Sequence, residues 1–163
     1  MHKDELNIIK QAILNEIEGY EFYNMAANQA GTEESKEAFK ELANEELKHA
    51  DYLKQLFDKI KTSQDDDFEL SFLSDPPSPN IYNWKKMNKK YTSLAISVFG
   101  IGIQMEKASI DFYEDAKKST NFEEAKKLFD ILIKWEKVHL DQFTEQYNIY
   151  KEEWWNDQEF APF

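Results

Sequence analysis

The sequence predicts an all-α protein, a bundle of four long helices arranged as two antiparallel hairpins joined by a long crossover. Apolar residues recur at alternating three- and four-residue steps over four long stretches, which is the period of an amphipathic helix. The chain has only four glycines and four prolines, too few for a turn-rich β-sandwich or barrel. Its length of 163 residues suits one domain, so residues 1–163 are expected to share a single core.

The first two helices are expected to form one hairpin. The first covers about residues 3–30, where Leu6, Ile9 and Ile13 begin the apolar stripe. The second covers about residues 33–61, and Thr32 is expected to cap its start. The short connection between them forces the two helices to run antiparallel.

The second hairpin is expected to follow a long crossover. Residues 62–88 contain three of the four prolines and are long enough to run the length of a bundle. The third helix then covers about residues 89–119 and the fourth about residues 122–150, with Asn121 as its cap and Glu124 three residues on. Residues 151–163 form an aromatic tail that is expected to dock onto the bundle of its own subunit or a partner.

Composition excludes several classes of function. The chain carries 20 basic and 32 acidic residues, a formal net charge of −12, and its basic residues are all lysines. Such a chain is poorly suited to bind nucleic acid or an anionic membrane. Its longest apolar run is too short to span a bilayer, and a cytoplasmic location is expected. The absence of cysteine excludes disulfides, iron–sulfur clusters and rubredoxin-type iron sites.

The chain also contains an internal repeat. Shifted by 90 residues, the sequence overlays on itself without a gap between Glu16 and His49. The repeated polar pairs are Glu16 with Glu106, Glu46 with Glu136, His49 with His139, and Tyr23 with Tyr113. Two similar amphipathic hairpins would repeat apolar residues, but they would not account for repeated carboxylates and histidines.

These repeated polar residues predict a dinuclear metal site. They continue the apolar stripes of their helices, so a bundle would bring four carboxylates and two imidazoles together in its core. Buried, unpaired carboxylates are strongly unfavourable, whereas two divalent cations neutralise four of them. The expected ligands are Glu16, Glu46, His49, Glu106, Glu136 and His139. Glu45 and Glu18 lie off the stripes and are expected to play no part in metal binding. Oxygen and imidazole ligands suit two iron ions, with manganese as the alternative.

Several of these stretches resemble the four-helix domain of the rubrerythrin family, which belongs to the ferritin-like di-iron carboxylate proteins. They are residues 12–23, Glu45-Glu46-Leu47-Lys48-His49, residues 105–113 and Glu136-Lys137-Val138-His139. The resemblance covers about residues 3–150 and implies a ferritin-like four-helix bundle. It further implies that Glu46 and Glu136 bridge the metals, with Glu16, Glu106, His49 and His139 as terminal ligands.

Tyr23 and Tyr113 lie one face along from the expected ligands. Two roles are open for them: hydrogen bonds that orient the terminal glutamates, or plain packing as aromatic residues of the bundle core.

Two features depart from the family pattern. Rubrerythrins proper carry a rubredoxin-like iron site with four cysteines, which this chain lacks. They also carry an extra carboxylate one turn after the ligand of the third helix, where this chain has Ser109. Ser109 belongs to a row of small residues that includes Gly102. Such a row either leaves space for an oxidant beside the metals or lets the helices approach closely.

The resemblance implies a di-iron oxidoreductase of the peroxidase or ferroxidase type, which reduces hydrogen peroxide or dioxygen. Because the chain has no cysteine-bound iron, its electrons are expected from an external donor such as a rubredoxin-type protein. Two alternatives stay open, a non-catalytic iron-binding or sensing module and a dimanganese, catalase-like enzyme. A homodimer is also expected, because residues 94–103 are apolar almost all the way round their helix.

Overall fold

The computed structural model describes residues 2–62, 84 and 92–158. They form four helices: α1 (His2–Gln29), α2 (Glu33–Thr62), α3 (Thr92–Ser119) and α4 (Glu123–Asp157). The described part of the chain contains no strand, and the predicted all-α, ferritin-like bundle is confirmed. None of these helices has a stretch long and apolar enough to cross a membrane.

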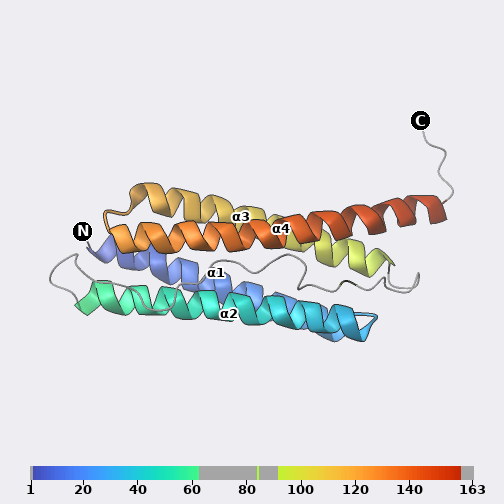
Figure 1. The fold of residues 1–163 in the computed structure, drawn as a ribbon, viewed down its shortest axis with the longest axis horizontal. Helices are drawn as coiled ribbons and strands as arrows, with labels where there is room; N and C mark the ends of the chain where they lie inside the picture. The colour runs from blue at the N-terminus through green and yellow to red at the C-terminus, as the bar shows by residue number, and fades with distance from the viewer. Residues whose placement is uncertain (1, 63–83, 85–91, 159–163) are drawn as a thin grey trace.

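The four helices pair as two hairpins. α1 packs along α2 and α3 along α4, and the two pairs lie against each other to complete the bundle (Figure 1). α2 ends and α3 begins at opposite ends of the bundle, as the predicted crossover requires (Figure 1). The predicted crossover and the expected start of the third helix at residue 89 lie outside the described residues, except for Trp84.

The helix starts agree with the sequence in one case and differ in the other. Thr32 Oγ1 accepts a hydrogen bond from the backbone N–H of Ser35 at 3.2 Å, as expected of a cap. The predicted cap at Asn121 is wrong, because α4 begins at Glu123 and Phe122 stands at its N-cap without a side-chain hydrogen bond. Phe122 is buried in the core, and its extended backbone leads directly into the helix.

The end of α4 also differs from the prediction. The helix runs to Asp157 rather than Tyr150, so residues 151–157 continue the helix instead of forming a tail. No glycine or proline interrupts residues 146–158, so nothing in the local sequence stops the helix there. Trp155 remains 48% exposed, and its ring packs against that of Trp154. Residues 159–163 of the predicted tail lie outside the described residues, so its docking stays a prediction. The homodimer stays a prediction.

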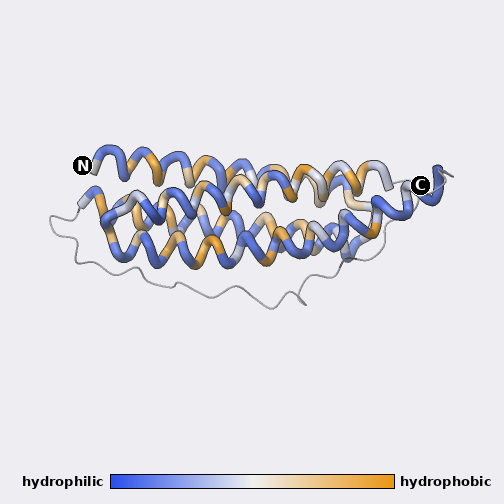
Figure 2. Tube along the Cα trace, turned by 90° about the horizontal axis from the view of Figure 1, so that it is seen from above, coloured by the Kyte–Doolittle hydropathy of each residue, from blue (hydrophilic) through white to orange (hydrophobic). Residues whose placement is uncertain are grey.

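The core consists of two apolar clusters, one toward each end of the bundle. One includes Ile9, Leu56 and Phe129, and the other includes Phe39, Phe99 and Phe143. Hydrophobic residues recur along every helix between hydrophilic ones, as amphipathic packing requires (Figure 2). The polar residues of the predicted metal site lie between the two clusters, so both ends of that site are closed by apolar side chains.

Trp84 is packed against the bundle, although it belongs to the segment that the sequence assigned to the crossover. Its ring meets the rings of Phe39 and Phe99 at centroid distances of 5.1 and 5.3 Å. Its indole N–H donates to Gln142 Oε1 at 3.2 Å. Trp84 therefore anchors the chain between α2 and α3 to the second apolar cluster.

Candidate metal centre

The structure brings the six predicted ligands together at the middle of the bundle. Each hairpin contributes a Glu from its first helix and a Glu-x-x-His pair from its second, because residues three apart share a helix face. None of the six residues is more than 4% exposed; they are Glu16 on α1, Glu46 and His49 on α2, Glu106 on α3, and Glu136 and His139 on α4. A buried polar cluster thus interrupts the apolar core.

The six residues form two overlapping groups that are each able to hold a metal ion. One group consists of Glu16, Glu46, His49 and Glu136, and the other of Glu46, Glu106, Glu136 and His139. Within each group, one ligand atom of every residue lies within 4.8 Å of the others. Glu46 and Glu136 belong to both groups, so the shared carboxylates stand between two neighbouring positions.

Both histidines direct the same ring atom toward the carboxylates. His49 Nδ1 lies 3.5 Å from Glu16 Oε2 and 3.0 Å from Glu136 Oε1. His139 Nδ1 lies 3.5 Å from Glu106 Oε1 and 3.2 Å from Glu46 Oε1. The two positions are therefore related by the same pseudo-two-fold symmetry as the sequence repeat.

Two tyrosines cross between the hairpins at this site. Tyr23 on α1 donates its hydroxyl hydrogen to Glu106 on α3, and Tyr113 on α3 donates to Glu16 on α1. Both tyrosines are 1% exposed, so they also fill the core. Of the two roles left open by the sequence, the structure shows both in the same residues. Each hydroxyl fixes one oxygen of a carboxylate, and the second oxygen makes no hydrogen bond to the described residues.

Glu45 is placed differently from the sequence-based expectation. It is only 2% exposed, and its Oε2 lies 2.6 Å from Nε2 of His139. The stripe analysis missed it because the interior of a four-helix bundle covers a wide arc of each helix, wide enough for two successive residues. Glu18, the other residue expected to lie off the stripe, is exposed.

Burial dominates the electrostatics of the cluster. Burial raises the pKa of Glu16 well above its ordinary value, and the negative charges of Glu46 and Glu136 raise it further. Burial and the charge of Glu136 do the same to the pKa of Glu106. Burial opposes charging of His49, but the charge of Glu16 together with hydrogen bonds to Glu136, Glu16 and Glu46 outweighs it and raises the pKa of His49 well above its ordinary value. Without metal, the cluster therefore retains protons.

The cluster also leaves buried oxygen atoms without a partner. Glu16 Oε2, Glu106 Oε2 and Glu136 Oε2 make no hydrogen bond to any residue that the structure describes. Buried polar atoms are normally satisfied, and leaving them bare is costly. Divalent cations supply what these oxygens lack, since two of them balance four carboxylates and take oxygen and imidazole donors. The residues present fit a dimetal centre.

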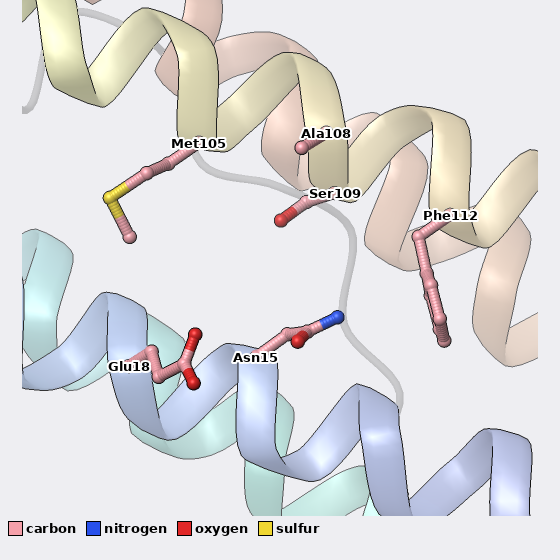
Figure 3. Close-up of a pocket in the computed structure, with 6 residues that line it drawn as sticks. All are labelled: Asn15, Glu18, Met105, Ala108, Ser109 and Phe112. Carbon is pink, nitrogen blue, oxygen red and sulfur yellow. The ribbon is translucent and has the colours of Figure 1, made fainter.

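Within the row of small residues, Gly102 lies at a close helix contact and Ser109 lies at a pocket. A Cβ added at Gly102 would lie 3.0 Å from the ring of Phe143, so this glycine lets α3 approach α4 closely. Ser109 instead lines a pocket of about 280 Å³ between α1 and α3 (Figure 3). Asn15 and Glu18 line the same pocket from α1. None of the six predicted ligands lines this pocket, so it is a groove on the outer side of α1 and α3.

The fold and the buried cluster define a ferritin-like four-helix protein with a candidate dimetal centre. The family model described as rubrerythrin matches residues 7–147, and the chain therefore belongs to the rubrerythrin family. Among solved structures, a hypothetical protein from Pyrococcus furiosus is similar, with a TM-score of 0.70 and 23% identity over 91% of both chains. At that identity, the similarity concerns the fold. None of the curated proteins compared with the chain matches it.

Removing a carboxylate of the cluster should reduce metal content, whereas removing an exposed neighbour should not. Glu16 and Glu18 lie two residues apart on α1, one buried and one exposed. Glu16→Ala is expected to lower the metal content from about two ions per chain to about one or fewer, because one position loses an oxygen ligand. Glu18→Ala should retain the wild-type content. Elemental analysis after dialysis against metal measures both, and equal loss from the two variants would contradict the assignment.

The metal-free protein should become less stable as the pH rises. The folded-state pKa values of Glu16 and Glu106 lie above the ordinary 4.5, so the folded chain holds protons that the unfolded chain releases. This stability is lost as the pH rises from 4.5 through the raised values. The raised pKa values of His49 and His139 act in the same direction above their ordinary 6.5.

Glu46 and Glu136 do not oppose this trend in the same window. Burial raises their pKa values, but hydrogen bonds from neighbouring carboxyl groups and the histidines outweigh it and hold them below 4.5. Their contribution to the stability of the folded chain is lost only when the pH falls below 4.5 toward these lowered pKa values. Thermal unfolding followed by circular dichroism should show a melting temperature that falls between about pH 5 and about pH 8. Added divalent metal should raise it most at the higher pH, and a flat metal-free profile would contradict this prediction.

Proposed function

We propose that the protein is a di-iron oxidoreductase that reduces hydrogen peroxide or dioxygen. The observation that carries this proposal is the pair of buried ligand groups that share Glu46 and Glu136. Membership of the rubrerythrin family supports iron as the metal, because the family belongs to the ferritin-like di-iron proteins. Each iron position would have one terminal carboxylate and one histidine, with the two shared carboxylates between them.

The ligand roles follow from the two groups. Glu46 and Glu136 would bridge the metals, while Glu16 with His49 and Glu106 with His139 would each complete one position. Both histidines would bind through Nδ1, the atom that faces the carboxylates. Iron held by these residues would supply the two electrons that, with two protons, reduce hydrogen peroxide to two molecules of water.

The chain contributes positioning and exclusion of bulk water. Tyr23 and Tyr113 hold the outer carboxylates in place by hydrogen bonds, so those ligands need not reorganise when metal binds. The two apolar clusters close both ends of the site. Turnover also requires an external electron donor, for which we propose a rubredoxin-type protein.

The proposed function is tested by oxidising the ferrous protein. Metal-free protein loaded anaerobically with two ferrous ions per chain should become ferric within seconds of adding peroxide or dioxygen, as followed by stopped-flow absorption. A reduced rubredoxin should then restore the ferrous state and support repeated cycles. Iron that binds but is not oxidised would identify a non-catalytic module. Manganese, rather than iron, in protein grown without metal supplementation would instead favour the dimanganese enzyme.

Ser109 offers a test of which oxidant the site prefers. Rubrerythrins proper carry a carboxylate at this position, whereas Ser109 leaves a pocket that has room for a longer side chain. We expect the wild type to show little preference for peroxide over dioxygen, and Ser109→Glu to raise the ratio of the two oxidation rates. Gln104→Glu, an exposed substitution on α3 outside this pocket, serves as the matched control. A wild type that already strongly prefers peroxide would contradict this expectation.

A further inference from the structure

The sequence repeat is broken at one buried position beside the cluster. The residue preceding the first shared carboxylate is Glu45, and its counterpart 90 residues later is Trp135. Glu45 is 2% exposed and Trp135 is 7% exposed, so both lie in the interior. The six ligands and the two tyrosines repeat exactly in type, but the groups that contact the outer sides of the two histidines do not.

At His139, the outer ring nitrogen meets a carboxylate. His139 Nε2 lies 2.6 Å from Glu45 Oε2, while Nδ1 of the same ring faces Glu46 and Glu106. A histidine that binds metal through Nδ1 carries its hydrogen on Nε2, so Nε2–H donates to Glu45. Such a carboxylate fixes the ring orientation and the tautomer, and it makes the imidazole a stronger electron donor to the metal.

At His49, the residue that corresponds to Glu45 in the repeat is the aromatic Trp135, whose ring also lies 6.4 Å from that of His139. The ring of Trp135 packs edge-on against the imidazole of His49, with centroids 5.2 Å apart and an angle of 73° between the planes. An indole N–H is a donor only, so it cannot accept the hydrogen of Nε2. His49 Nε2 is buried and has no hydrogen-bond partner among the residues that the structure describes.

We propose that Glu45 is a positioning residue that makes the two metal positions unequal, so that the position at His139 and Glu106 binds metal more tightly and fills first. This inference rests on the proposed dimetal site and deepens it. The ligands of the two positions are the same in type, and the difference arises one contact further out. A carboxylate hydrogen-bonded to a metal-binding histidine typically changes metal affinity by about 10- to 100-fold. We expect the dissociation constants of the two binding steps to differ by a factor in that range.

The experiment is a titration of the metal-free protein with cobalt(II), followed by visible absorption and calorimetry. The wild type should bind two ions in two separated steps. His139→Gln should remove the tighter step and His49→Gln the weaker one, which assigns the steps to positions. Glu45→Gln keeps the size of the side chain but removes its charge, and it should weaken only the tighter step, by about tenfold or more. Glu41→Gln, an exposed substitution on the same helix, should change neither step.

Two further variants separate positioning from structural support. Glu45→Asp should restore part of the lost affinity if the carboxylate itself is required. Trp135→Glu places a carboxylate beside His49 and should strengthen the weaker step, which a general loss of packing would not do. The melting temperature of each metal-free variant identifies any that fail to fold, and Glu45→Gln then remains as the mildest test.

The results distinguish this inference from the proposed function. Two ions bound with equal affinity, loss of the tighter step in His49→Gln, or unchanged affinities in Glu45→Gln would each overturn the inference while leaving the dimetal site intact. Binding of fewer than two ions by the wild type would instead overturn the dimetal site itself.

Discussion

The burial of four carboxylates in the middle of a helical bundle is the constraint on which the rest of this structure depends. Ionised carboxylates in an apolar interior are stable only when neighbouring groups or cations compensate their charge. Here the compensation comes from two histidines, two tyrosine hydroxyls and the retained protons of Glu16 and Glu106. Each of the four helices contributes to the cluster, so the site and the packing of the bundle are mutually dependent.

The contacts that compensate the charge also connect the two hairpins. Tyr23 and Tyr113 link α1 with α3, and the histidines link α2 with α4 through His49–Glu136 and His139–Glu45. Helix contacts are otherwise far denser within each hairpin than between the hairpins. The polar cluster therefore joins the two halves together with the two apolar clusters, which also combine residues of both hairpins. Metal binding should consequently affect the stability of the whole bundle and not only of the site.

Much of the site could be predicted from the sequence because its residues repeat at a constant offset. A shift of 90 residues identified the four carboxylates, two histidines and two tyrosines that the structure brings together. The repeat did not identify Glu45 as part of the cluster, because the residue 90 positions later is Trp135 and not a second carboxylate. The packing of Trp84 on the core could not be predicted either, because a proline-rich sequence with no helical period does not indicate which of its side chains is buried.

The sequence by itself determined the number of helices, their pairing into hairpins and the identity of the six converging residues, because period and spacing are local properties of a helix. Tertiary structure alone decided which groups face each other across the bundle. It placed Glu45 against His139 and Trp135 against His49, and it opened a pocket at Ser109 while closing the gap at Gly102. These choices depend on the distance and rotation between helices, and residues far apart in the chain set both together.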